Sequence, residues 1–294
     1  MPPKSSVIKT SSIKKKIGSA LVYLFAIGIS SIIILLYVLL AMASISPELD
    51  GLIPKSFSLS AWQKVLSGRL EVPGAEYQYP NLYLVIGNTF LLAISVAFIE
   101  MLIASLAAYA ISRFKFSGRG TLLSLILVLH SFPAITLLIA VFYILNMMGL
   151  YDTLLGVILV KVAFDMPLAI WIMKGFFDAV PWDLEMSALV DGCSRLQAWW
   201  KVLMPAVRNG LMVVLIFGFL SGWGEFIFVL TFISSQSYWT LSMLVYAFTT
   251  GEYFYVDPCI TATVGIIYML PVVVFFLFAQ KYLLRIQIVG KGAF

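Results

Sequence analysis

Charged residues are scarce in this sequence of 294 residues. Lys, Arg, Asp and Glu together make up 11% of it, hydrophobic residues make up 62%, and the mean hydropathy is +1.02. Because soluble domains carry about 25% charged residues, this shortage argues against a soluble enzyme, a disordered chain and a nucleic-acid-binding protein, despite the net charge of +5. The composition instead predicts an integral membrane protein.

Residues that carry chemistry are also few. The two cysteines, Cys193 and Cys259, make no disulfide framework, and the single histidine, His130, has no second His or Cys at the spacing of a metal site. These three residues lie in different parts of the chain, which argues against a nucleophile and base of an intramembrane enzyme. The sequence has no G-x-x-x-x-G-K-[ST] phosphate-binding loop, so any ATP that this protein uses must be hydrolysed by another polypeptide.

Long apolar runs dominate the sequence. A helix needs about 20 mostly apolar residues to cross a bilayer, and six segments meet this requirement: residues 17–43, 82–111, 121–145, 153–173, 207–233 and 260–284. They predict an all-α integral membrane protein with six transmembrane helices, in which residues 17–294 form a single transmembrane domain. The first run ends at Ala41-Met42-Ala43, which resembles a signal-peptidase site, but it exceeds the roughly 7–15 apolar residues of a signal peptide. We therefore expect an uncleaved anchor.

The charges outside these runs predict the topology. The N-terminal tail (1–16) contains five lysines and no acid, and the stretch after the second run and the C-terminal tail (285–294) are likewise basic without acids. The outer segment (44–81) holds four acids against three basic residues. Because positive charge is retained on the cytoplasmic side of a membrane, both termini are expected to be cytoplasmic.

The connection at residues 174–206 is the only one with dense mixed charge. Pro181 and the acids after it suit the first turn of a helix, and Gly192 can end that helix in a left-handed conformation. Ser194 can then cap a second helix that Pro205 closes. This predicted hairpin either lies on lipid headgroups or offers its apolar face to the groove of a partner protein. Its balanced charge favours the partner protein.

Several short segments share an order and spacing that resemble a known family. They are Asn88-Thr89, Ala107-Ala108-Tyr109-Ala110, residues 113–119, Phe132-Pro133, residues 149–153 with Gly156, Pro167, Trp223-Gly224-Glu225-Phe226 and Gln280-Lys281-Tyr282. Together with the 174–206 connection, which resembles an E-A-A…D-G…P cytoplasmic loop, they are similar to permease subunits of binding-protein-dependent ABC importers. Within that family they resemble the carbohydrate branch that includes the second maltose permease subunit. The resemblance covers the chain from about residue 82 onward.

The resemblance implies a type I ABC importer permease fold in the cytoplasmic membrane of a prokaryote. It also implies partners: a second homologous permease subunit, two ATPase subunits that bind ATP and Mg, and an extracytoplasmic solute-binding protein. This chain would then be no enzyme, would bind no cofactor itself, and would carry a mono- or oligosaccharide.

The ATPase subunits are implied to dock on the 174–206 loop. The docking residues carried over from the family motif are Glu185, Met186, Ala188, Asp191, Gly192 and Pro205. We expect Glu185 and Asp191 to seat the helix in a cleft of the ATPase by pairing with a basic residue there. The loop departs from the family pattern because its acid stands one position early and Cys193 replaces the usual Ala, while Gly224 replaces an Asn further along.

Several ionisable residues lie inside the predicted spans, and four of them are candidates for a translocation pathway: His130, Lys161, Asp165 and Glu225. Each would cost about 2.5–3.5 kcal/mol at the bilayer centre, so they should face the bundle interior. Lys161 and Asp165, one helical turn apart, form either a structural pair or part of the pathway. Glu100 is either protonated or paired with Lys161. Glu225 has either a packing or a gating role, and His130 either packs or contacts the solute.

Two further alternatives remain open. Glycerol-3-phosphate or a polyol is the second choice of solute: a phosphate would need Lys or Arg in the pathway, and Lys161 is the only one of these away from the ends of a span. From another class of protein, an ion-coupled secondary transporter could use Glu100, Lys161 and Asp165 as a proton relay. The outer aromatic residues at 236–240 and 252–255 form either an interfacial belt or a surface for the solute-binding protein or a sugar.

Overall fold

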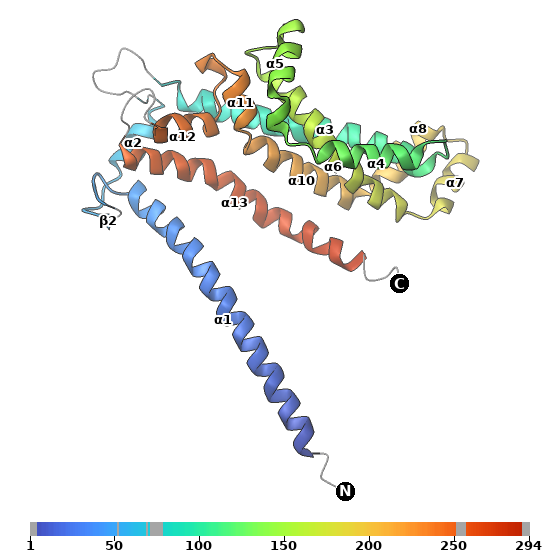
Figure 1. Cartoon of the computed structure of the whole chain (residues 1–294), viewed down its shortest axis with the longest axis horizontal. Helices are drawn as coiled ribbons and strands as arrows, with labels where there is room; N and C mark the ends of the chain where they lie inside the picture. Colours follow the sequence, from blue (N-terminus) through green and yellow to red (C-terminus); the bar gives the residue numbers. More distant parts are fainter. Residues whose placement is uncertain (1–4, 52, 69, 71–78, 251–256, 290–294) are drawn as a thin grey trace. The chain divides into compact units, whose positions relative to one another are not determined.

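The computed structural model describes residues 5–51, 53–68, 70, 79–250 and 257–289, and these are mainly helical (Figure 1). They form two compact units, one within residues 1–65 and 257–266 and the other within 66–256 and 267–294. The outer aromatic residues 252–255 lie outside the described residues.

The first unit begins with α1 (Ser5–Ser44), which starts inside the predicted tail 1–16. A hairpin of β1 (Leu49–Asp50) and β2 (Ile53–Pro54) follows, and after it comes the short helix α2 (Ser60–Leu66). The start of α13 (Pro258–Val289) belongs to this unit. There the Thr263 hydroxyl lies 3.4 Å from the carbonyl oxygen of Ser44 at the end of α1.

The second unit is organised around α3 (Leu82–Arg113), which packs most extensively against α6 (Leu154–Asp178) and α10 (Arg208–Trp223). Glycines allow α10 to approach α3 closely. A Cβ added to Gly222 would lie 2.8 Å from the Cα of Ala93, and one added to Gly218 would lie 2.9 Å from the Cα of Ala97. Small residues at such positions let helix backbones meet, which is the usual basis of helix association in membranes.

The remaining helices of this unit are shorter. They are α4 (Arg119–His130), the 3-10 turn η1 (Ala134–Leu137), α5 (Leu138–Met147), α7 (Trp182–Val190), α8 (Arg195–Ala198), the π-turn η2 (Trp199–Leu203), α9 (Met204–Ala206), α11 (Ile227–Phe232), the 3-10 turn η3 (Gln236–Tyr238) and α12 (Leu241–Thr250).

Two of the predicted spans are broken helices. Within the described ranges four helices are long and apolar enough to cross a membrane, and the number reaches six if each bent pair of helices counts as one span. The predicted span 121–145 bends by 90° between α4 and η1, at Pro133, which cannot donate a backbone hydrogen bond. The expectation of one helix over 207–233 is wrong, because α10 ends at Trp223 and α11 starts anew at Ile227.

Candidate functional site

The predicted helical hairpin of the 174–206 loop is present. The φ angle of Gly192 is +88°, and the amide of Cys193 donates to the carbonyl of Ala188 at 3.0 Å, so α7 ends in a left-handed glycine turn. Ser194 caps α8 through a reciprocal pair of hydrogen bonds with Gln197. Pro205 does not close the second helix as predicted. It lies within α9, and the chain turns by 82° only after Ala206.

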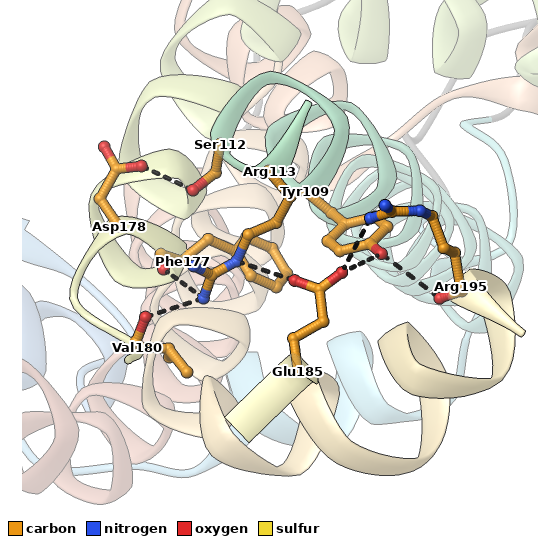
Figure 2. A network of polar contacts seen from close by, with 8 residues as sticks. All are labelled: Tyr109, Ser112, Arg113, Phe177, Asp178, Val180, Glu185 and Arg195. Carbon is orange, nitrogen blue, oxygen red and sulfur yellow. Dashed lines mark hydrogen bonds and ion pairs between the residues drawn. The ribbon is translucent and has the colours of Figure 1, made fainter. Parts of the chain in front are cut away.

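A buried carboxylate fastens this hairpin to the rest of the second unit. Glu185 of α7 has no exposed surface, and Figure 2 shows its side chain pointing between two arginines. Its Oε2 lies 3.3 Å from Nε of Arg113, a charge contact without hydrogen-bond alignment. Its Oε1 accepts a hydrogen bond from Tyr109 Oη at 2.8 Å and lies 3.4 Å from Nη1 of Arg195. The carboxylate therefore joins α7 to the end of α3 and the start of α8.

Arg113 extends the same network to α6 (Figure 2). Its Nη2 donates to the carbonyl oxygen of Phe177, in the last turn of α6, at 3.1 Å, and to that of Val180, just beyond the helix, at 2.8 Å. Beside it, the hydroxyl of Ser112 donates to Asp178 at 2.6 Å. Polar contacts therefore hold the end of α3 to the end of α6 and, through Glu185, to α7.

The apolar core beneath the hairpin comes from the same elements. Its buried residues belong to the second halves of α3 and α6, to η2 and α9, and to α10 with the residue before it: Ala104, Ala108, Tyr109, Ile111, Ala169, Ile170, Met173, Phe177, Trp199, Leu203, Met204, Val207 and Val214. Burying Trp199 and Leu203 against α3 and α6 attaches the second helix of the hairpin to the spans. A force on the hairpin would therefore reach α3, α6 and α10 directly.

The six predicted docking residues divide into two groups. Asp191, Gly192 and Pro205 are exposed and Met186 is half-buried, so they remain candidates for contact with a partner. Ala188 is buried. Glu185 cannot pair with a basic residue of a partner in this conformation, because its carboxylate is enclosed and its partners are arginines of its own chain. The geometry gives Glu185 a positioning role.

Large apolar side chains of the hairpin are nevertheless exposed. Among the described residues they are Trp182, Leu184, Val190, Leu196 and Trp200. Val190, next to the glycine turn, is 87% exposed. Contiguous apolar side chains on a surface indicate a contact with protein or lipid.

A second candidate site lies deeper in the second unit. A cavity of about 280 Å³ is lined by nine residues: His130, Phe132, Ala134, Lys161, Phe164, Asp165, Glu225, Ile227 and Phe228. These include all four residues that the sequence marked as possible members of a translocation pathway. The structure therefore brings them together around one space.

Charged side chains bridge the elements around the cavity. Lys161 Nζ lies 3.3 Å from Asp165 Oδ2 and 3.0 Å from Glu225 Oε2. Asp165 also accepts a hydrogen bond from Ser221 of α10 at 2.6 Å. Glu225 accepts one from the amide of Phe228 at 2.8 Å, which caps the start of α11. The break between α10 and α11 is thus tied to α6 by a three-membered ion cluster.

Glu100 is not part of this ion cluster. Its side chain is 3% exposed, its Oε2 has no hydrogen-bond partner, and it lies against Gly218 of α10. The expected alternative of an ion pair with Lys161 is not seen in the described part of the chain, where the ion-pair partners of Lys161 are Asp165 and Glu225.

The loop after α11 is anchored at two points. Asn88 Nδ2 donates to the carbonyls of Ser237 at 2.8 Å and Trp239 at 3.0 Å. Asp152, before α6, accepts hydrogen bonds from the amides of Ser234 and Ser235 and from the Ser235 hydroxyl. Burial favours a higher pKa for the Asp152 carboxyl, but these three hydrogen bonds outweigh it and hold the pKa below its ordinary value. Trp239 is buried and so cannot belong to an interfacial belt.

Tyr109, Arg113 and Arg195 are functional candidates that the sequence did not single out. In the sequence, Arg113 belongs to the basic stretch that indicates topology and to the 113–119 segment of the family resemblance, and neither feature gives it a partner. A signal was present, since both Arg113 and Glu185 lie in segments that resemble the same family and carry opposite charges. Pairing these two opposite charges from separate motifs would have predicted the contact between Arg113 and Glu185.

Comparisons with known proteins agree with this geometry. The chain matches the family described as binding-protein-dependent transport system inner membrane component over residues 100–286. It is 33% identical over 197 residues to the sulfoquinovosyl glycerol transport system permease protein SmoH of Agrobacterium fabrum, covering 66% of this chain and 69% of that protein. It is also 33% identical over 183 residues to the trehalose transport system permease protein SugB of Mycobacterium tuberculosis, covering 62% and 67%.

The fold is shared with a solved structure. A chain of a bacterial ABC transporter involved in the import of the acidic polysaccharide alginate superimposes with a TM-score of 0.73. The match covers 96% of this chain and 99% of that chain at 19% sequence identity. The broken spans and the hairpin therefore belong to an established architecture.

Proposed function

Because this chain belongs to the family of binding-protein-dependent transport system inner membrane components, we propose that it forms half of the translocation pathway for a mono- or oligosaccharide in an ATP-driven importer. It has the type I ABC importer permease fold and is a multi-pass protein of the cell membrane. The names of its relatives SmoH and SugB, both sugar-transport permeases, support a carbohydrate as the solute.

A second, homologous permease subunit would supply the other half of the pathway. This is supported by α4 and η1, in which no residue is buried although most are apolar. In a membrane either lipid or another subunit covers such an apolar surface, and in the proposed importer the second permease subunit would cover it. An extracytoplasmic solute-binding protein would deliver the solute, as the family description indicates.

The energy would come from two ATPase subunits on separate chains, which would hold the ATP and Mg, because this sequence has no phosphate-binding loop. The observation that carries this proposal is the hairpin of α7 and α8, held to α3 and α6 by Glu185 and Arg113. The exposed apolar side chains of the hairpin, with Val190 beside the glycine turn that forms its tip, can enter a groove of the ATPase, in the manner of a helix bound by its apolar face. Both termini would lie on the same, cytoplasmic side.

The test is to disturb the tip without disturbing the membrane domain. Gly192→Asp places a side chain at φ +88°, where L-residues are strained. We expect the variant to insert into membranes but to lose its co-purification with the ATPase subunits. Gly118→Asp is the matched control, since Gly118 has φ +86° and open space around it but lies outside the hairpin. Undiminished assembly of Gly192→Asp, or equal loss in both variants, would remove the docking proposal.

The ion-coupled alternative is tested by the energy source. Among the described residues Lys161 pairs with Asp165 and Glu225 and not with Glu100, so no relay through Glu100 is supported. Uptake by cells that contain the complete importer should persist when an uncoupler collapses the proton gradient and should stop when ATP is depleted. The opposite pattern would favour an ion-coupled transporter.

A further inference from the structure

The cavity lies where two spans are interrupted. His130 ends α4, Phe132 lies in the break between α4 and η1, and Glu225 lies in the break between α10 and α11. Non-helical backbone at membrane depth is tolerated where it is buried in protein or lines a water-filled cavity. The two breaks and the cavity therefore belong to one arrangement that opens a polar space inside the second unit.

The charges that line this space are unequal. Lys161 stands between the carboxylates of Asp165 and Glu225. Among the described residues around the cavity it is the only lysine or arginine, so one ammonium faces two carboxylates. With both lining carboxylates ionised, the lining carries a net negative charge, because the single positive charge of Lys161 cannot balance two carboxylates. An anionic solute would therefore not be neutralised there.

The other walls are apolar and aromatic. Phe164 and Phe228 lie with ring centroids 5.3 Å apart, and Phe132 lines the same space. At about 280 Å³, the cavity is at the small end of the roughly 300–1,000 Å³ typical of small-molecule pockets. It has room for a single ring of a carbohydrate.

We propose that this cavity is a solute subsite that accepts an uncharged, hydroxyl-rich ring and rejects anionic solutes. Hydroxyl groups can donate to the free lone pairs of Asp165 and Glu225 and accept from Lys161, while the phenyl rings cover the apolar face of the sugar. A phosphate, sulfonate or carboxylate would instead meet two carboxylates. The names of the compared proteins include both a neutral sugar, trehalose, and an acidic one, alginate, so the charge preference rests on the cavity.

This inference rests on the proposed importer function, and a cysteine reporter tests it separately. In the intact importer with Cys193→Ser and Cys259→Ser, the variant Ala134→Cys places one thiol in the cavity wall. Its labelling rates are compared for a cationic reagent, trimethylammonium-ethyl methanethiosulfonate, and an anionic one, sulfonatoethyl methanethiosulfonate. The ratio of the two rates reports the potential inside the cavity.

We expect the cationic reagent to be favoured, and the ratio to fall severalfold in Glu225→Gln, since removing one negative charge from the cavity wall slows the cationic reagent and speeds the anionic one. Asp165→Asn is a second, independent variant and should give the same direction. The matched control is Asp183→Asn, an exposed acid of α7 outside the cavity, which should leave the ratio unchanged.

Protection by solutes completes the test. Glucose, maltose or trehalose should slow labelling, and glucuronate should not. The inference is overturned if the ratio ignores Glu225 and Asp165, if none of the three neutral sugars protects, or if glucuronate protects equally. ATP hydrolysis stimulated by the solute-binding protein, measured on the same preparation, reports the importer function by itself. Its loss beside an intact charge ratio would count against the proposed function alone.

Discussion

The ion pair between Arg113 and Glu185 gives the most quantitative prediction. Arg113 Nε and Glu185 Oε2 are 3.3 Å apart, and the two side chains are 2% and 0% exposed. At an effective dielectric constant of about 20, unit charges at this distance attract by about 5 kcal/mol. Replacing Arg113 by Met leaves the carboxylate buried beside Arg195, which is half-exposed and 3.4 Å away.

The variant Arg113→Met should therefore lower the free energy of unfolding by about 3–5 kcal/mol, the usual result of breaking a buried pair by removing one partner. The carbonyls of Phe177 and Val180 also lose their donor. The measurement is equilibrium unfolding of the purified protein in mixed micelles. Lys115→Met is the control, since Lys115 is exposed two residues further along and its loss should change stability by less than about 0.5 kcal/mol.

A double-mutant cycle separates the charge pair from the packing. Glu185→Gln keeps an oxygen that can accept from Tyr109 but removes the charge. In Arg113→Met/Glu185→Gln no unpaired charge remains, so the two losses should fall short of additivity by about 2 kcal/mol. Strict additivity, or equal stability of Arg113→Met and Lys115→Met, would refute the claim that this pair fastens the hairpin.

Three further predictions concern other contacts. Gly222→Ala should destabilise the packing of α3 on α10 by about 1–3 kcal/mol, because its Cβ would meet the backbone of Ala93. Gly87→Ala is the control, since Gly87 has open space around it and its replacement should not destabilise the protein, and thermal unfolding compares the two variants. Asp152→Ala should loosen the loop after α11 and speed its proteolysis, while Asp152→Asn, which keeps an acceptor and tolerates the φ of +58°, should lose less. The pKa of Asp152 is lower in the folded protein than in the unfolded chain, where it is about 3.9. The ionised carboxylate should therefore stabilise the folded protein above that pH, and this stabilisation should be lost as the pH falls through the folded pKa. Unfolding of wild type and Asp152→Asn over a pH series measures it.

Much of the fold could be predicted from local sequence. The apolar runs located the spans, and the order of Pro181, Gly192 and Ser194 predicted the hairpin because each residue type has a local backbone preference that needs no tertiary context. The breaks were harder to predict. The break at Pro133 lies in a run that is apolar enough to be predicted as one span. The stretch around Gly224 is also apolar enough to be predicted as continuous helix, and α11 starts anew where Glu225 caps the amide of Phe228.

The candidate sites were predicted in part for the same reason. Ionisable residues in apolar spans were singled out by their cost in lipid, and His130, Lys161, Asp165 and Glu225 indeed surround one cavity. Their pairing was not predictable, because Lys161 has partners both on its own helix and beyond the end of α10. Glu185 was expected to face a partner protein, and only the packing of α7 against α3 shows that Tyr109 and Arg113 enclose it.

The central claim is that this chain is a passive pathway driven by ATPase subunits on other chains. The most direct measurement is solute uptake into proteoliposomes that contain either this chain alone or the assembly of both permease and both ATPase subunits with the solute-binding protein. Accumulation against a gradient is expected only for the full assembly, and only with Mg-ATP. Uphill uptake by the chain alone, without nucleotide, would contradict the claim.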